Sequence, residues 1–170
     1  MIDRDVIESL IPHTGAMCLL DRVLDWSSES ITLATQTHRS LTNPLRAGGR
    51  LRALHLCEYG AQAMAVHGGL IARAAGKTAQ PGFLVSLRDV KLNCDYVDDL
   101  PGELAVRAER LMESVGSWQY RFTVSHNNEV LAEGRAAVIA RATCWSCSKW
   151  RWRACCSFWR RSSSRRSCAC

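Results

Sequence analysis

The chain has 170 residues, the length of one ordinary domain that can bury a hydrophobic core. Its formal net charge is +6, but residues 141–170 hold seven arginines, one lysine and no acidic residue, which leaves 14 basic against 16 acidic residues in residues 1–140. The body of the chain therefore lacks the charge of a nucleic-acid-binding module, and we expect no nucleic-acid partner.

Cysteine use and hydropathy narrow the class further. Six of the nine cysteines lie in residues 141–170, and Cys18, Cys57 and Cys94 are too scattered to form the framework of a disulfide-rich secreted domain. The first residues are amphipathic rather than a charged-then-apolar leader, and no run approaches the roughly 20 apolar residues that cross a bilayer. We expect a cytoplasmic protein with no membrane partner.

The first part of the chain predicts a short helix followed by two strands. Apolar residues at helical spacing indicate a helix over residues 2–11, which Pro12 ends. Apolar and β-branched residues then predict strands over residues 17–26 and 30–37. A loop over residues 38–49, which contains proline and glycine, leads into the longest helical segment.

That segment, residues 50–73, predicts one helix surrounded by protein. It is rich in helix-forming residues, and its apolar residues lie on every side rather than in one stripe. Glu58 and Gln62 stand out because they are four residues apart and therefore share one face. A carboxylate in an apolar helix is costly to bury, so we expect Glu58 either to have a chemical role or to pair with an arginine.

The rest of the body predicts four strands, because apolar, β-branched and aromatic residues alternate with polar ones between clear turn signals. These strands cover residues 83–95, 103–113, 117–126 and 129–140. The sequence therefore predicts a single α+β domain over residues 1–140, in which an antiparallel sheet wraps around one long central helix.

Residues 141–170 break with this pattern. The Cys144-x-x-Cys147 pair lacks the repeated spacing of zinc modules, and we expect no metal site. A bias to Arg, Ser, Cys and Trp is typical of a GC-rich gene read out of frame, so we hypothesise a disordered, frameshifted tail. Resequencing the gene across the codons for Ala140 and Arg141 tests this, because a genuine tail would leave no single-base change that restores an ordinary short ending.

Two separated segments carry a resemblance to a known family. Residues 11–23, IPHTGAMCLLDRV, are similar to the "PH…LLDRV" opening of the FabA/FabZ-type 3-hydroxyacyl-carrier-protein dehydratases, and residues 58–63, EYGAQA, are similar to the E-x-x-A-Q-A of their central helix. Asn43-Pro44-Leu45 and the sequence around Glu58 most resemble the ApeP-like branch, which is linked with aryl polyene-type pathways. The resemblance implies a hotdog fold over residues 1–140 and a dehydratase activity that needs no cofactor.

The resemblance also shows where this chain departs from the family pattern. In the FabZ type a catalytic histidine stands in a G-H-F-P loop fourteen residues before the acid, and that position here is Pro44. The base must therefore be another histidine, since the ordinary pKa of imidazole suits proton transfer near neutral pH. His13, in the first family motif, is our first candidate, and His38, in the loop before the central helix, is the second. The other three histidines are expected to be structural.

Dehydration of a 3-hydroxyacyl thioester assigns roles to further residues. Glu58 is expected to protonate the departing hydroxyl. Backbone amides near Arg52 and Ala53 are expected to lie at the helix N-terminus and to bind the thioester oxygen, because unpaired N–H groups there favour negative charge. Gln62 is counted with the substrate site, although a hydrogen-bonding clamp within the protein is the more conservative reading.

The expected partner is an acidic acyl carrier protein. Four arginines, Arg46, Arg50, Arg52 and Arg73, flank the two ends of the central helix and provide a local basic rim. An exposed sheet edge in hotdog proteins pairs with a second copy, so we expect at least a homodimer. Two alternatives stay open: an acyl thioesterase in which Glu58 acts with a water, and a non-catalytic acyl-binding or dimerisation partner. We also expect Asp21 and Arg22 to form a structural ion pair.

Overall fold

The computed structural model describes residues 2–80 and 82–140, and the tail expected over residues 141–170 lies outside this part of the chain. Its strands form a seven-stranded antiparallel sheet in the order β1-β2-β3-β5-β6-β7-β4. The strands are β1 (Ile2–Asp3), β2 (Arg22–Trp26), β3 (Ser30–Thr35), β4 (Gly82–Leu92), β5 (Leu104–Ser114), β6 (Ser117–His126) and β7 (Glu129–Ala140). The α-helices are α1 (Arg4–Leu10) and α2 (Leu56–Ala74).

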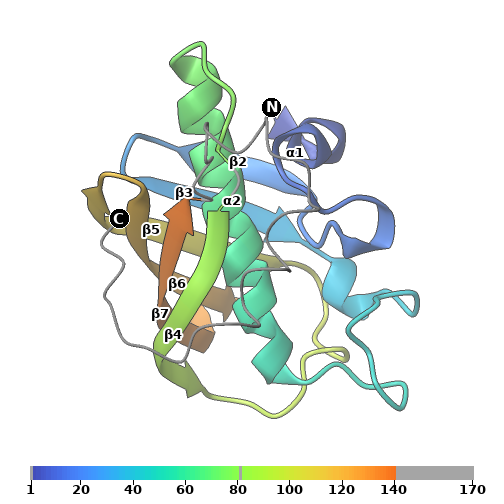
Figure 1. Cartoon of the computed structure of the whole chain (residues 1–170). Coiled ribbons are helices and arrows are strands. Elements are labelled where there is room, and N and C mark those ends of the chain that lie inside the picture. Colours follow the sequence, from blue (N-terminus) through green and yellow to red (C-terminus); the bar gives the residue numbers. More distant parts are fainter. Residues whose placement is uncertain (1, 81, 141–170) are drawn as a thin grey trace, which may run out of the picture.

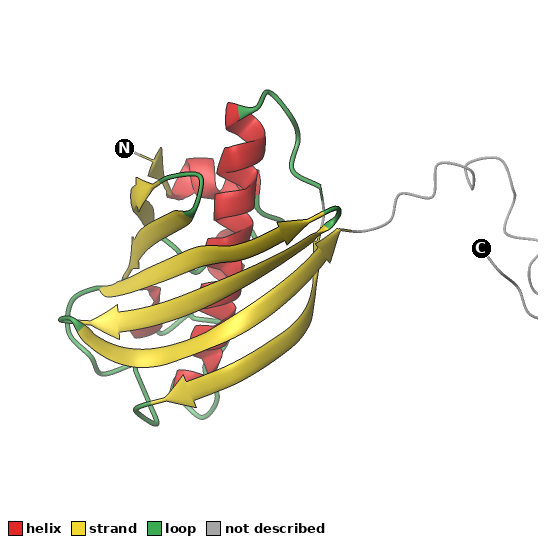
Figure 2. Ribbon diagram, turned by 90° about the vertical axis from the view of Figure 1, so that its left-hand side faces the viewer, coloured by secondary structure: helices red, strands yellow, loops and turns green. Residues whose placement is uncertain are grey.

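The sheet curves around α2, as the sequence predicted (Figures 1 and 2). The helix packs against β3, β5, β6 and β7, and most of its residues are buried, including the fully buried Tyr59, Ala63 and Val66. This explains why its apolar residues do not form one stripe. The short helix α1 packs against α2 and lies next to β1, at one edge of the sheet. The expected α+β architecture is confirmed.

The close approach of α2 to the sheet depends on two glycines that enclose one aromatic ring. Phe122 on β6 is fully buried, and a Cβ added at Gly60 of α2 would lie 2.6 Å from its Cγ. A Cβ at Gly134 of β7 would lie 2.8 Å from Cε1 and Cζ of the same ring. Only residues without a side chain fit these two contacts.

The central helix begins later than the sequence predicted. Arg52 forms an isolated bridge with Tyr96, the amide of Ala53 donates to the carbonyl of Asp95 at 2.9 Å, and a 3-10 turn over Ala53–His55 precedes α2. Arg52 is extended, with φ −74° and ψ 144°, and backbone contacts with the segment after β4 hold residues 51–53 in place. These contacts are non-local, and helix propensity does not reveal them.

Two expectations for the strand predicted over residues 17–26 are also wrong. β2 begins at Arg22, because residues 15–17 form a 3-10 turn and residues 18–20 are buried without joining the sheet. Asp21 and Arg22 do not pair with each other: Asp21 binds Arg4, and Arg22 binds Glu103 through two hydrogen bonds of 2.6 Å. Neighbouring residues in extended backbone point to opposite sides, which separates these two charges.

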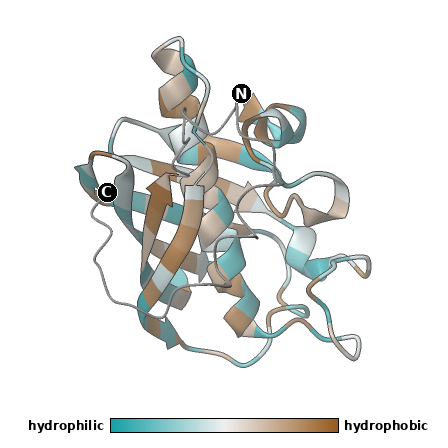
Figure 3. Ribbon diagram, viewed as in Figure 1, coloured by the Kyte–Doolittle hydropathy of each residue, from teal (hydrophilic) through white to brown (hydrophobic). Residues whose placement is uncertain are grey.

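The strand at the opposite edge of the sheet is largely exposed. Among the residues that the structure describes, β4 is an edge strand that pairs only with β7, and every residue of it except Ser86 is exposed. Much of the strand is coloured as hydrophobic in Figure 3, and Phe83, Leu84 and Val85 are 55%, 45% and 51% exposed. A long apolar edge of this kind is a typical site of association with another chain. Within the described residues, no helix combines the length and the apolar character needed to cross a bilayer.

Candidate active site

The site is centred on Glu58, in the first turn of α2. Its carboxylate Oε1 lies 3.5 Å from Nε2 of His13, and the two side chains are 34% and 31% exposed. The structure thus brings together the predicted acid and the first candidate base, both within reach of solvent. Two groups that can each give or take a proton at this distance are suited to a reaction with two proton transfers.

Gln62, one turn further along α2, fixes the carboxylate. Its Nε2 donates to Oε1 of Glu58 at 3.1 Å and to the carbonyl of Met17 at 2.9 Å, while its Oε1 accepts the amide of Leu19 at 2.9 Å. The side chain is fully buried, and these bonds use both amide hydrogens. Gln62 therefore joins the segment around Met17 and Leu19 to α2. This fits the prediction of a hydrogen-bonding clamp within the protein rather than a residue that contacts the substrate.

His13 lies in the loop between α1 and the 3-10 turn Gly15–Met17. Its Nδ1 is buried and has no hydrogen-bond partner within the described part of the chain, so only Nε2 faces a polar group. The ring is therefore held by the backbone of its loop and not by bonds of its own.

The second candidate base, His38, does not reach Glu58. It lies in a 3-10 turn, Thr37–Arg39, is fully buried, and its Nε2 is 3.2 Å from the carbonyl of Leu100. Burial lowers the pKa of His38 below its ordinary value, because the charged imidazolium is poorly solvated there. Hydrogen bonds and ion pairs of the Glu58 side chain within residues 2–80 and 82–140 involve only His13 and Gln62.

The remaining histidines also lie elsewhere. His67 is fully buried in α2, with Nε2 2.9 Å from the carbonyl of Ser27 and Nδ1 2.9 Å from the hydroxyl of Tyr120. Because a carbonyl only accepts, Nε2 of His67 carries the proton and Nδ1 accepts from Tyr120. His126 contacts the carbonyl of Pro101, and His55 belongs to the 3-10 turn before α2.

The structure changes the expected roles of Arg52 and Ala53. Ala53 is buried and its amide is already bonded to Asp95, so this N–H is not the free oxyanion donor that the sequence predicted. Arg52 is exposed, and its guanidinium has no ion pair within the described residues. By contrast, Arg50 pairs with Asp98 and stacks on Tyr96, and Arg46 donates to three backbone carbonyls.

A buried polar network, which the sequence did not indicate, attaches the loop before α2 to the helix. The hydroxyl of Tyr59 accepts from Nδ2 of Asn43 at 2.9 Å and lies 3.1 Å from Oγ1 of Thr37, which in turn donates to the carbonyl of Leu19. Burial raises the pKa of the Tyr59 phenol. Beside this network is a partly open cavity of about 110 Å³. It is lined by Arg4, Ala16, Thr37, Ser40, Thr42 and Asn43.

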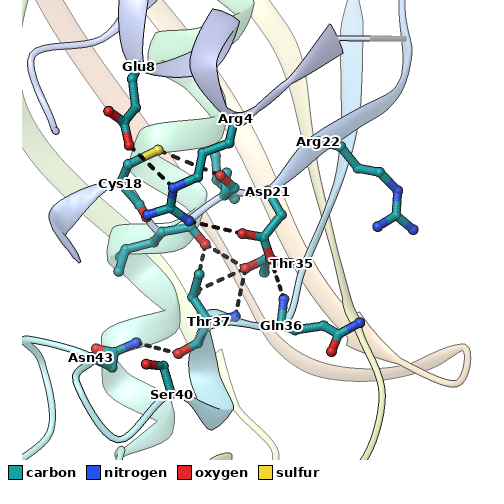
Figure 4. A network of polar contacts seen from close by, with 12 residues as sticks. Arg4, Glu8, Cys18, Asp21, Arg22, Thr35, Gln36, Thr37, Ser40 and Asn43 are labelled. Atoms are coloured by element: carbon teal, nitrogen blue, oxygen red, sulfur yellow. Dashed lines mark hydrogen bonds and ion pairs between the residues drawn. The ribbon is translucent and has the colours of Figure 1, made fainter. Parts of the chain in front are cut away.

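Arg4 is the other site residue that the sequence did not single out. Its guanidinium donates to the carbonyls of Gly15 and Cys18, which follow His13 in the chain. It also binds Glu8 and Asp21, as Figure 4 shows. Its partners lie 4 to 17 residues away, and no motif signals such contacts. Among the described residues, no three His, Cys, Asp or Glu side chains gather as a metal site.

Comparison with solved structures supports the fold. The chain aligns with the dehydratase heterocomplex ApeI:P from Xenorhabdus doucetiae with a TM-score of 0.73 and 20% identity, over 81% of this chain and 91% of that chain. A thioesterase family protein from Silicibacter pomeroyi aligns with a TM-score of 0.57 and 15% identity, over 79% and 94% of the two chains. These likenesses establish the hotdog fold.

The sequence comparisons identify the family. No curated protein matches the chain. A family model described as ApeP-like, ApeP dehydratase, matches residues 6–146. This range contains His13, Glu58 and Gln62 and covers most of the chain. The chain belongs to the ApeP-like dehydratase family.

Proposed function

We propose that the protein dehydrates 3-hydroxyacyl thioesters carried on acyl carrier protein, in fatty-acid or aryl polyene-type biosynthesis in the cytoplasm. The observation that carries this proposal is the 3.5 Å approach of His13 to Glu58 in a member of a dehydratase family. The reaction needs a base for the proton on C2 and an acid for the hydroxyl on C3, and these two residues provide one of each.

The proton transfers balance around this pair. Neutral His13 takes the proton from C2, the C2–C3 double bond forms, and the C3–O bond breaks as protonated Glu58 delivers its proton to the hydroxyl, which leaves as water. His13 then holds one proton more and Glu58 one fewer. Because the two groups face each other, the proton can pass from imidazole to carboxylate, and no cofactor is required.

Two other residues support the site in this proposal. Gln62 positions the Glu58 carboxylate through the bond at 3.1 Å. Arg52, exposed and free of ion pairs within the described residues, contributes positive charge for the acidic carrier protein or its phosphopantetheine phosphate. The amide of Ala53 contributes structure only. His38 is retained as a buried structural residue rather than as the base.

We place a second chain on the edge of β4, in a homodimer or a higher homo-oligomer. The exposed apolar residues of β4 favour association. The solved neighbour from Xenorhabdus doucetiae belongs to the dehydratase heterocomplex ApeI:P, so the second chain is either a copy of this one or a different protein. Light scattering of the purified protein distinguishes the two, because a chain that needs a different partner stays monomeric alone.

The test of the function is incubation with 3-hydroxyacyl and saturated acyl thioesters of a carrier protein, followed by mass spectrometry. Enoyl product that disappears in Glu58→Gln and in His13→Asn is the expected result. Glu129→Gln, which removes an exposed carboxylate at the start of β7, serves as the matched control. Free acid from the saturated substrate would instead indicate a thioesterase, and binding without turnover a non-catalytic acyl-binding partner.

A further inference from the structure

The position of His13 is set by its loop, since its Nδ1 has no hydrogen-bond partner within the described residues. Ile11 precedes the loop and is buried, and Cys18 to Leu20 follow it and are also buried. Between these anchors, residues 12–17 are mostly exposed. Something outside the loop must therefore hold this short segment where His13 faces Glu58.

Arg4 of α1 makes that connection. Its Nη2 donates to the carbonyl of Gly15 at 2.9 Å and to the carbonyl of Cys18 at 2.7 Å, the first residue of the 3-10 turn and the residue that follows it. Gly15 is two residues from His13. One nitrogen thus closes the turn from the side of α1, as Figure 4 shows for the contact with Cys18.

The rest of the guanidinium is held by two carboxylates. Nη1 donates to Oδ1 of Asp21 at 3.0 Å, and Nε donates to Glu8 at 3.3 Å. The other oxygen of Asp21 accepts the amide of Gln36, just after β3, at 2.7 Å. The planar fork of an arginine suits such a set of partners, and a lysine offers only one nitrogen.

The opposite side of the loop is held by Gln62, through the carbonyl of Met17 and the amide of Leu19. The loop is therefore fixed between α1 and α2. The Gln62 side also contacts Glu58 directly, whereas Arg4 contacts neither Glu58 nor the ring of His13.

We infer that Arg4 is a positioning residue that keeps His13 in register with Glu58. This inference rests on the proposed function, because its consequence for turnover requires the pair to be catalytic. Loss of Arg4 is expected to lower kcat by about 10-fold or more with little change in KM, since a displacement of about 1 Å in a catalytic group can cost ~10²-fold.

The experiment measures the coupling of the two side chains separately from activity. In the full-length protein, the imidazole resonance of His13 is compared between wild type and Glu58→Gln, and the same comparison is made in an Arg4→Met background. Glu58→Gln is expected to shift the His13 resonance less in the Arg4→Met background than in the wild-type background. Arg22→Met is the matched control, because the Arg22–Glu103 pair is 35% and 31% exposed and the Arg4–Asp21 pair is 34% and 32% exposed.

If Glu58→Gln shifts the His13 resonance equally in the Arg4→Met and wild-type backgrounds, the inference is overturned, whatever the activity of the variants. A similar reduction in Arg22→Met also overturns it, because the effect would then be general loosening. If wild type forms no enoyl product, the proposed function fails, while the resonance comparison still decides the role of Arg4. If Arg4→Met does not fold, Arg4→Lys replaces it. A reduced shift of the His13 resonance on Glu58→Gln then supports the inference, and a shift equal to that in the wild-type background refutes it.

Discussion

One carboxylate oxygen of Glu58 faces both Nε2 of His13, at 3.5 Å, and Nε2 of Gln62, at 3.1 Å. The carboxylate therefore joins a loop near the start of the chain to the middle of the long helix. In the proposed reaction His13 exchanges a proton with Glu58, while the hydrogen bond from Gln62 holds this oxygen in position. Substitutions at these three positions are expected to differ in what they change.

Glu58→Gln keeps the shape of the side chain and removes the acid. We expect enoyl formation to fall by roughly 10²- to 10⁴-fold, the usual contribution of one acid or base. His13→Asn is expected to cost a similar factor. The double variant should be little worse than either single variant, because the two groups act as a unit. Rates from mass spectrometry check this, and fully multiplicative losses would contradict it.

Gln62→Leu is expected to reduce stability as well as activity. The substitution leaves the buried amide of Leu19 without its partner and frees the carbonyl of Met17. Each buried polar group left unpaired costs about 1–3 kcal/mol, so we expect the free energy of unfolding to fall by about 2–4 kcal/mol in urea titrations. Gln119→Leu, at an exposed position on β6, is the control and should change stability by less than about 0.5 kcal/mol.

Gly60→Ala tests the contact between α2 and Phe122. The new methyl group would lie 2.6 Å from the ring, and such overpacking costs about 1–3 kcal/mol. Gly68→Ala on the same helix meets nothing within 4 Å and is expected to stabilise by about 0.5–1 kcal/mol, because alanine has the higher helix propensity. Thermal unfolding of both variants measures the difference, and equal effects would contradict the close approach.

Stability is expected to decline as pH falls below about 6.5. Burial lowers the pKa of His38 and His67 from the ordinary value of 6.5, so the unfolded chain takes up protons first. Stability is thus fully present above pH 6.5 and decreases as pH falls towards the native pKa values, by at most about 1.4 kcal/mol per pH unit for each histidine.

Urea titrations at pH 7.5 and 5.5 measure this dependence. His67→Gln should show a smaller loss between the two pH values than wild type, even if it is less stable at both. An equal loss would mean that protonation of His67 does not contribute. The same burial raises the pKa of its partner Tyr120 to about 12, so Tyr120 stays neutral across this range.

Local patterns were sufficient where neighbours in sequence decide the structure. The alternation in residues 117–126 and 129–140 predicted β6 and β7 with the bounds that the structure shows. Patterns failed where a distant segment intervenes. The helix expected from residue 50 begins at Leu56, because Tyr96 pairs with Arg52 and the carbonyl of Asp95 accepts the amide of Ala53.

Sequence patterns predicted the architecture and the family resemblance and singled out Glu58, because hydrophobic periodicity and an acid within an apolar helix are local properties. They left the partner of Glu58 open between His13 and His38. The folded chain shows which of the two histidines lies beside Glu58. Arg4 and Gln62 hold the loop of His13 against α2, whereas His38 is buried against the carbonyl of Leu100. These contacts join residues far apart in the chain, and their geometry exists only once the sheet has wrapped around the helix.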